Sequence, residues 1–70
     1  MWNLEGQYVT GLYLQMFPVG GTVTESRVKY GGSVQHTVQL NQPIQVFGSV
    51  KTVVLLDDSE VQTVVDSIAV

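Results

Sequence analysis

The sequence lacks cysteine altogether and has little charge, with nine charged residues among 70. Without cysteine, disulfides and thiolate metal sites are excluded. Such cross-links and metal sites commonly stabilise small secreted domains. The longest uncharged apolar run, Val53 to Leu56, is far shorter than the about 20 residues that a membrane helix needs. The first five residues have no basic segment followed by an apolar one, so we expect no secretory signal, no membrane association and a cytoplasmic location.

The few charges are unevenly distributed along the chain. Residues 1–56 contain three basic and two acidic side chains, a net charge of +1, whereas residues 57–70 contain four acidic side chains and no basic one. The net charge of −3 therefore belongs to the C-terminal segment. An anionic partner is not excluded for the rest of the chain.

What the chain does contain is β-strand periodicity. Residues 33–40 alternate between apolar and polar side chains, with His36 on the apolar side, and residues 24–30 alternate as well. A loop of three residues around Gly31–Gly32 gives each face of this hairpin a uniform character, with Val28 opposite Val34 or His36. We predict such a loop, with a glycine in the left-handed conformation.

Further strands are predicted on both sides of this hairpin. Residues 7–17 resemble a first strand with a bulge or bend at Gly11, and residues 18–21 are predicted to form the first turn. Pro43 cannot donate to a ladder, so a new or strongly bent strand is expected after it. A turn at Gly48–Ser49 then leads to a strand over residues 50–56.

The period changes after Leu56. Val61, Val64, Val65 and Ile68 have helical spacing, and Asp57 with Glu60 has the spacing of a capping box. A short C-terminal helix is predicted, with an edge strand from Val61 to Val65 as the alternative, because valine and threonine are weak helix formers.

These elements predict a single, mainly β domain. We expect a barrel over residues 1–56, followed by an acidic helix or edge segment over residues 57–70. The expected fold is a small antiparallel SH3-like barrel, or a strongly bent sheet of four to five strands, with the short C-terminal helix. An OB-like barrel usually needs a longer chain. Neither fold specifies a function.

Catalytic and metal-binding chemistry have little support in the sequence. The only histidine, His36, lies on the apolar side of its strand, which predicts a core histidine bonded to backbone or to Ser26. No metal-ligand or nucleophile motif surrounds it. The paired glycines precede strands rather than helices, so they do not indicate a phosphate site. We therefore expect a non-enzymatic protein with no cofactor and no metal.

Two kinds of binding remain. The apolar side chains exceed what one small barrel readily buries, which predicts self-association or binding of another protein. The interface candidates are Tyr13, Phe17, Val53, Leu55, Val61 and Val65. The alternative is weak binding of single-stranded nucleic acid, in which few cations would contact phosphates and an aromatic ring would stack on bases. Its candidate residues are Arg27, Lys29, Tyr30 and Lys51.

Three segments carry a resemblance. The stretches Ser26–Gly32, His36–Val38 and Pro43–Gly48 resemble short β-rich proteins of tailed phages that infect marine cyanobacteria, over about residues 20–56. No active-site motif contributes to the resemblance. It implies a phage accessory protein, either a virion component or an effector that binds a host protein, located in the virion or in the host cytoplasm.

Overall fold

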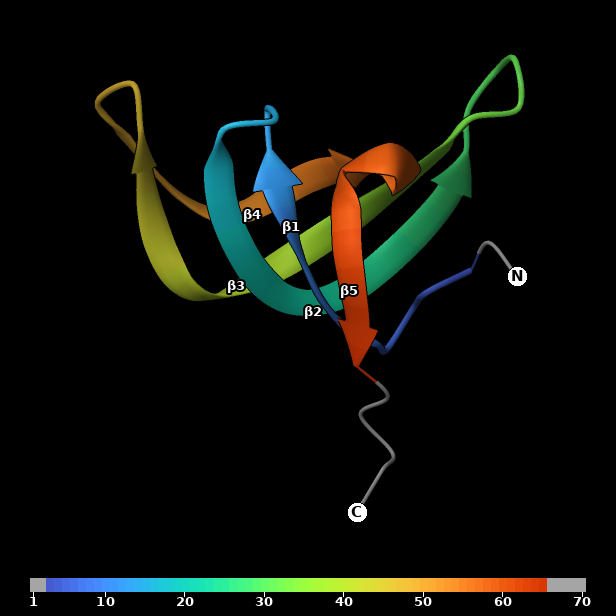
Figure 1. Cartoon of the computed structure of the whole chain (residues 1–70), viewed down its shortest axis with the longest axis horizontal. Coiled ribbons are helices and arrows are strands. Elements are labelled where there is room, and N and C mark those ends of the chain that lie inside the picture. Colours follow the sequence, from blue (N-terminus) through green and yellow to red (C-terminus); the bar gives the residue numbers. More distant parts are fainter. Residues whose placement is uncertain (1–2, 66–70) are drawn as a thin grey trace.

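The computed structural model describes residues 3–65 of the chain, which form one antiparallel sheet of five strands (Figure 1). The strands and one short 3-10 turn, η1, follow each other as β1 (Tyr8–Tyr13), β2 (Phe17–Val28), β3 (Val34–Val46), β4 (Ser49–Asp57), η1 (Asp58–Glu60) and β5 (Val61–Val65). The mainly β fold predicted from the periodicity is therefore confirmed.

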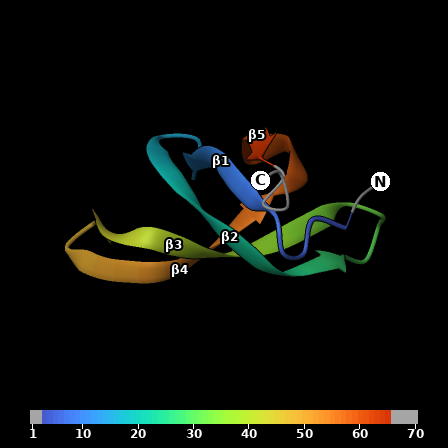
Figure 2. The ribbon, with the colours of Figure 1, turned by 90° about the horizontal axis from the view of Figure 1, so that it is seen from below.

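The strand order across the sheet is β4-β3-β2-β1-β5, so the last strand returns to pair with the first. The sheet bends strongly. Figure 2 shows β1 and β5 lying above the layer of β3 and β4, with the long β2 crossing from one layer to the other. The two outer strands, β4 and β5, do not pair with each other in the described part of the chain. The sheet formed by residues 3–65 does not close, so of the two predicted forms, SH3-like barrel or strongly bent sheet, the strongly bent sheet is observed.

The core lies on the inner face of this bend. It consists mainly of valines at alternate strand positions, because β-branched side chains pack well on a pleated surface. Val9 of β1, Val23 of β2, Val38 of β3 and Val54 of β4 are almost completely buried, and Leu56 joins them.

The first turn is not where the paired glycines predicted it. The chain reverses at Leu14–Met16, where Leu14 and Gln15 have φ of 54° and 59°. Gly20 and Gly21 lie inside β2. Gly21 is required there for close approach, since a Cβ at this position would overlap the backbone carbonyl oxygen of Gln39 in β3.

The turn between β2 and β3 has the predicted register. Val28 lies opposite Val34, and the N–H of Lys29 donates to the carbonyl of Ser33 at 2.6 Å. Three residues therefore lie between Lys29 and Ser33, and both glycines among them have positive φ, 98° and 93°. The three-residue loop with a left-handed glycine is confirmed.

The predicted irregularities at Gly11 and Pro43 are also present. The pairing of β1 with β5 shifts register between Thr10 and Gly11. The pairing of β3 with β4 shifts between Gln39 and Ile44, where Leu40 to Pro43 have no partner residue in β4. Pro43 therefore lies in a bulge, where its missing N–H is tolerated.

The C-terminal helix prediction is wrong, and its alternative, an edge strand from Val61 to Val65, is confirmed. Within residues 3–65, helical geometry is limited to the 3-10 turn at residues 58–60. The N–H of Asp57 donates to Glu60 Oε1 at 2.9 Å, so the predicted capping spacing operates in this single turn. Ile68 lies outside the described residues. No helix within residues 3–65 has the length and apolar character to cross a membrane.

Candidate interaction surface

The outer side of β4 exposes two apolar side chains at the edge of the sheet. Val53 and Leu55 are 46% and 48% exposed, whereas their neighbours in sequence, Val54 and Leu56, are buried. Across the sheet, the outer residues next to them are polar. These cross-strand rows run Thr22–Gln39–Val53 and Glu25–Thr37–Leu55. The outer face of β2 and β3 is thus polar beside these two side chains, whereas the first row continues through Tyr8 of β1 to the exposed Val65 of β5. We name Val53 and Leu55 the β4 edge pair.

The other predicted interface residues are dispersed. Tyr13 and Val61 are partly buried and pack against the core. Phe17, opposite Tyr13 in β1, meets Phe47 edge to face with ring centroids 5.7 Å apart. Val65 is 47% exposed on β5, at the opposite edge of the sheet from β4. Of the six predicted residues, only the β4 edge pair lies on one strand and one face.

Phe47 was not among the predicted interface residues, and it is 78% exposed. Phe47 occupies the two-residue turn between β3 and β4 with φ of 49°. A signal was available, because the Gly48 that follows it is typical of a tight hairpin turn, whose residues project from the sheet.

The most buried polar group is His36, at the centre of a hydrogen-bonded chain. Its ring is 0% exposed. Its Nδ1 lies 2.8 Å from Ser26 Oγ, and its Nε2 lies 2.9 Å from Asp58 Oδ1. The N–H of Leu4 donates to Ser26 Oγ at 3.0 Å. The predicted bond to Ser26 is confirmed, and Asp58 is a second partner.

One set of proton positions satisfies all of these groups. If His36 is neutral with its proton on Nε2, it donates to the Asp58 carboxylate, and Nδ1 accepts from the Ser26 hydroxyl. Ser26 Oγ then accepts from Leu4. The chain of bonds ties the N-terminal segment, β2, β3 and η1 together. A serine, a histidine and an aspartate are aligned, but the serine is only 7% exposed and its oxygen is engaged twice.

The residues predicted for nucleic-acid binding do not come together as free cations. Lys29 Nζ binds Asp57 Oδ1 at 3.1 Å, and Arg27 lies 3.5 Å from a carboxylate oxygen of Glu25. Lys51 lies near the start of β4, opposite Ile44 of β3, whereas Asp57, the partner of Lys29, is the last residue of β4. Tyr30 is fully exposed in the loop between β2 and β3.

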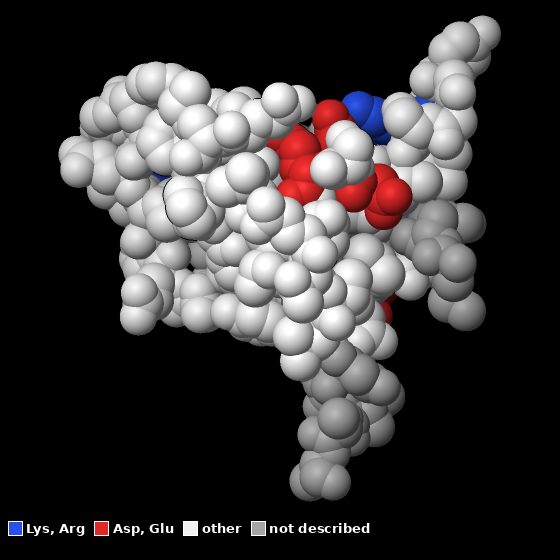
Figure 3. Space-filling model, viewed as in Figure 1, with Lys and Arg blue, Asp and Glu red and all other residues white. Residues whose placement is uncertain are grey.

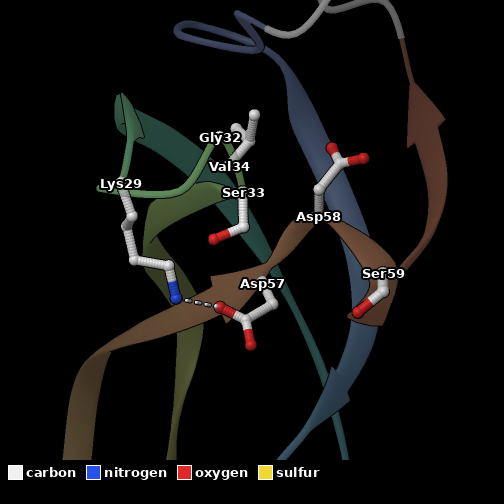
Figure 4. Close-up of a pocket in the computed structure, with 7 residues that line it drawn as sticks. All are labelled: Lys29, Gly32, Ser33, Val34, Asp57, Asp58 and Ser59. Carbon is white, nitrogen blue, oxygen red and sulfur yellow. Dashed lines mark hydrogen bonds and ion pairs between the residues drawn. The ribbon is translucent and has the colours of Figure 1, made fainter.

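A shallow hollow of about 390 Å³ lies between the β2–β3 loop and η1. Figure 4 shows the Lys29–Asp57 ion pair across it, with Asp58 and Ser59 on the side of η1. Figure 3 shows acidic side chains gathered in one area beside a basic one, while most of this face carries no charge. Within residues 3–65, no group of three or more histidine and acidic residues is arranged to hold a metal ion.

In comparisons with protein-family models, with curated proteins and with solved structures, the chain has no match.

Proposed function

We propose that this chain is a non-enzymatic interaction domain that works by self-association through the edge of β4. The observation that carries the proposal is the β4 edge pair, two half-exposed apolar side chains on a strand with a single neighbour in the sheet. An edge strand presents unpaired backbone groups, and side chains beside it that are apolar rather than charged favour addition of another strand.

The alternatives have less support. We assign His36 a structural rather than a catalytic role. Ser26 and His36 are buried, and their polar atoms bond to each other, to Leu4 and to Asp58. Binding of nucleic acid would require Lys29 and Arg27 to leave their carboxylate partners. Three phosphate contacts give only weak binding at physiological salt, so this cost is not offset.

We also propose that the fold is a partly open SH3-like barrel. Its support is the return of β5 to β1 after the short turn η1, and the bend of β2 between two layers. The phage accessory role stays a prediction. Of its two forms we propose the virion component, because self-associating chains suit assemblies of repeated copies. Mass spectrometry of purified virions would test it, and absence of the chain from them would contradict it.

Sedimentation equilibrium tests self-association directly. Between about 10 μM and about 1 mM, the mean mass should rise above the 7.7 kDa of one chain, since small interfaces give weak complexes. The double variant Val53→Thr, Leu55→Thr should stay monomeric, because threonine keeps the strand propensity and removes apolar surface. Val50→Thr, at another exposed valine of β4, is the matched control and should associate like the natural chain. A natural chain that stays at 7.7 kDa throughout would contradict the proposed function.

A further inference from the structure

We infer that the occupant of the β4 edge is β4 of a second copy, paired antiparallel about a twofold axis at Val54. This inference rests on the proposed function and deepens it by naming the partner and the register.

The direction of the β4 backbone groups follows from the hydrogen bonds of β2. Ser26 lies opposite His36 in β3, but the N–H of Ser26 donates to the carboxylate of Glu5 at 3.0 Å. Ser26 and His36 therefore form a pair without ladder hydrogen bonds. Because backbone groups in an antiparallel sheet point alternately to the two neighbours, those of His36 point to its β4 partner, Leu56. By the same alternation, the N–H and C=O groups of Val53 and Leu55 point away from β3.

Two features of β4 limit which residues offer outward-pointing backbone groups to a partner. Asp57 is the next residue whose groups point outward, and its N–H already donates to Glu60 Oε1 at 2.9 Å. Before Val53, the register with β3 shifts, and Lys51 lies opposite Ile44. Val53 and Leu55 are thus the residues between these two limits that offer both a donor and an acceptor at the edge.

In only one of the antiparallel registers compared below do Val53 and Leu55 both form all of their outward backbone hydrogen bonds with the second copy. With the axis at Val54, Val53 of each copy lies opposite Leu55 of the other, and both pairs exchange two hydrogen bonds. The apolar side chains then meet across the junction on the outer face. With the axis at Leu55, Val53 would lie opposite the carboxylate-bearing Asp57 of the second copy, whose N–H is engaged. With the axis at Val53, Leu55 would lie opposite Lys51 of the second copy.

Charge also favours a second copy in this register. Lys51 and Asp57 lie three positions before and after Val54. The twofold therefore places the lysine of each copy level with the aspartate of the other. Residues 52–56 contain no charge, so the centre of the junction brings no like charges together. The acidic turns η1 of the two copies lie at opposite ends of it.

Disulfide cross-linking tests the register, because the natural chain has no cysteine. Two single variants, Val53→Cys and Leu55→Cys, are prepared, mixed in equal amounts and oxidised. In the inferred register, position 53 of one copy lies about 5.5 Å in Cα distance from position 55 of the other, within the range of a disulfide. The mixture should give about tenfold more cross-linked dimer than either variant alone, since like positions lie farther apart.

The control pairs Leu55→Cys with Thr63→Cys, an exposed position on β5. Efficient cross-linking of this pair would show β4 joined to β5, as in a ring, and would overturn the inference. Cross-linking of Val53→Cys or Leu55→Cys alone, as efficient as in the mixture, would overturn the register. Circular dichroism of the reduced variants checks that each is folded. If the chain self-associates in sedimentation but the mixture does not cross-link, the inference fails and the proposed function stands; a monomer in sedimentation removes both.

Discussion

His36 shows how one residue joins separate parts of the molecule. Its place on the apolar side of an alternating strand indicated burial, and its bond to Ser26 followed from the pairing of the two strands. The bond to Asp58 could not be predicted in the same way. It depends on the turn η1, which follows Asp57 at the point where β4 pairs with Gln35 of β3, and the direction of this turn leaves no local pattern in the sequence.

The substitution His36→Phe should lower the free energy of unfolding by about 2 kcal/mol, because it leaves the buried Ser26 hydroxyl without its acceptor. Urea denaturation gives the change. Asp58→Asn is the matched control: it keeps an acceptor oxygen at a position whose side chain is 61% exposed, so its effect should be below about 1 kcal/mol. An unchanged midpoint for His36→Phe would contradict a structural role for the ring.

Gln15 is a second residue whose conformation has a measurable cost. Its φ of 59° is in the left-handed region, which costs roughly 1 kcal/mol for a residue with a Cβ. Gln15→Gly should therefore stabilise the fold by up to about 1 kcal/mol. Gln45→Gly, at an exposed position inside β3, is the control and should destabilise it, because glycine weakens a strand interior. A loss of stability in Gln15→Gly would show that its side chain is needed in the turn.

At the scale of elements, local patterns predicted strands better than they predicted turns. Alternation located β3 and the last part of β2, and Pro43 indicated the bulge. The first turn was misplaced because glycine has two uses. At Gly31 and Gly32 it permits positive φ, whereas at Gly21 it permits contact between two backbones. The two uses look alike in a sequence.

Gly21→Ala should destabilise the chain by about 3 kcal/mol, since the new methyl group would overlap the Gln39 carbonyl oxygen and force β2 away from β3. Gly20→Ala is the neighbouring control. A Cβ there would meet chiefly the hydroxyl end of the Tyr8 side chain, which can rotate aside, so its cost should stay within about 1 kcal/mol. Equal thermal unfolding of the two variants would contradict the close approach at Gly21.

The segment after Leu56 had both helical spacing and valine-rich composition. After the single turn η1 this segment forms a strand, as its valine content favours, and Val61–Val65 pairs with β1. Propensity is a weak guide by itself, but here strand pairing with β1 adds the hydrogen bonds of a ladder, whereas a short isolated helix of valine and threonine is only marginally stable.

At the scale of the whole molecule, the bent sheet of the described residues 3–65 leaves two strands with one neighbour each, β4 and β5. The apolar surplus predicted from composition is distributed over several surfaces, so counting valines could indicate association but not its location. The location became visible only with the cross-strand rows, in which polar side chains of β2 and β3 lie beside the β4 edge pair.

Hydrogen exchange of backbone amides, measured residue by residue by NMR at about 10 μM and about 1 mM, tests most directly whether β4 is the self-association edge. If β4 of a second copy pairs with this edge, exchange at Val53 and Leu55 slows by about tenfold at the higher concentration, because their N–H groups become donors to the second copy, while amides of β5 exchange at an unchanged rate. Unchanged exchange at both β4 residues, or slowing confined to β5, would contradict self-association through β4.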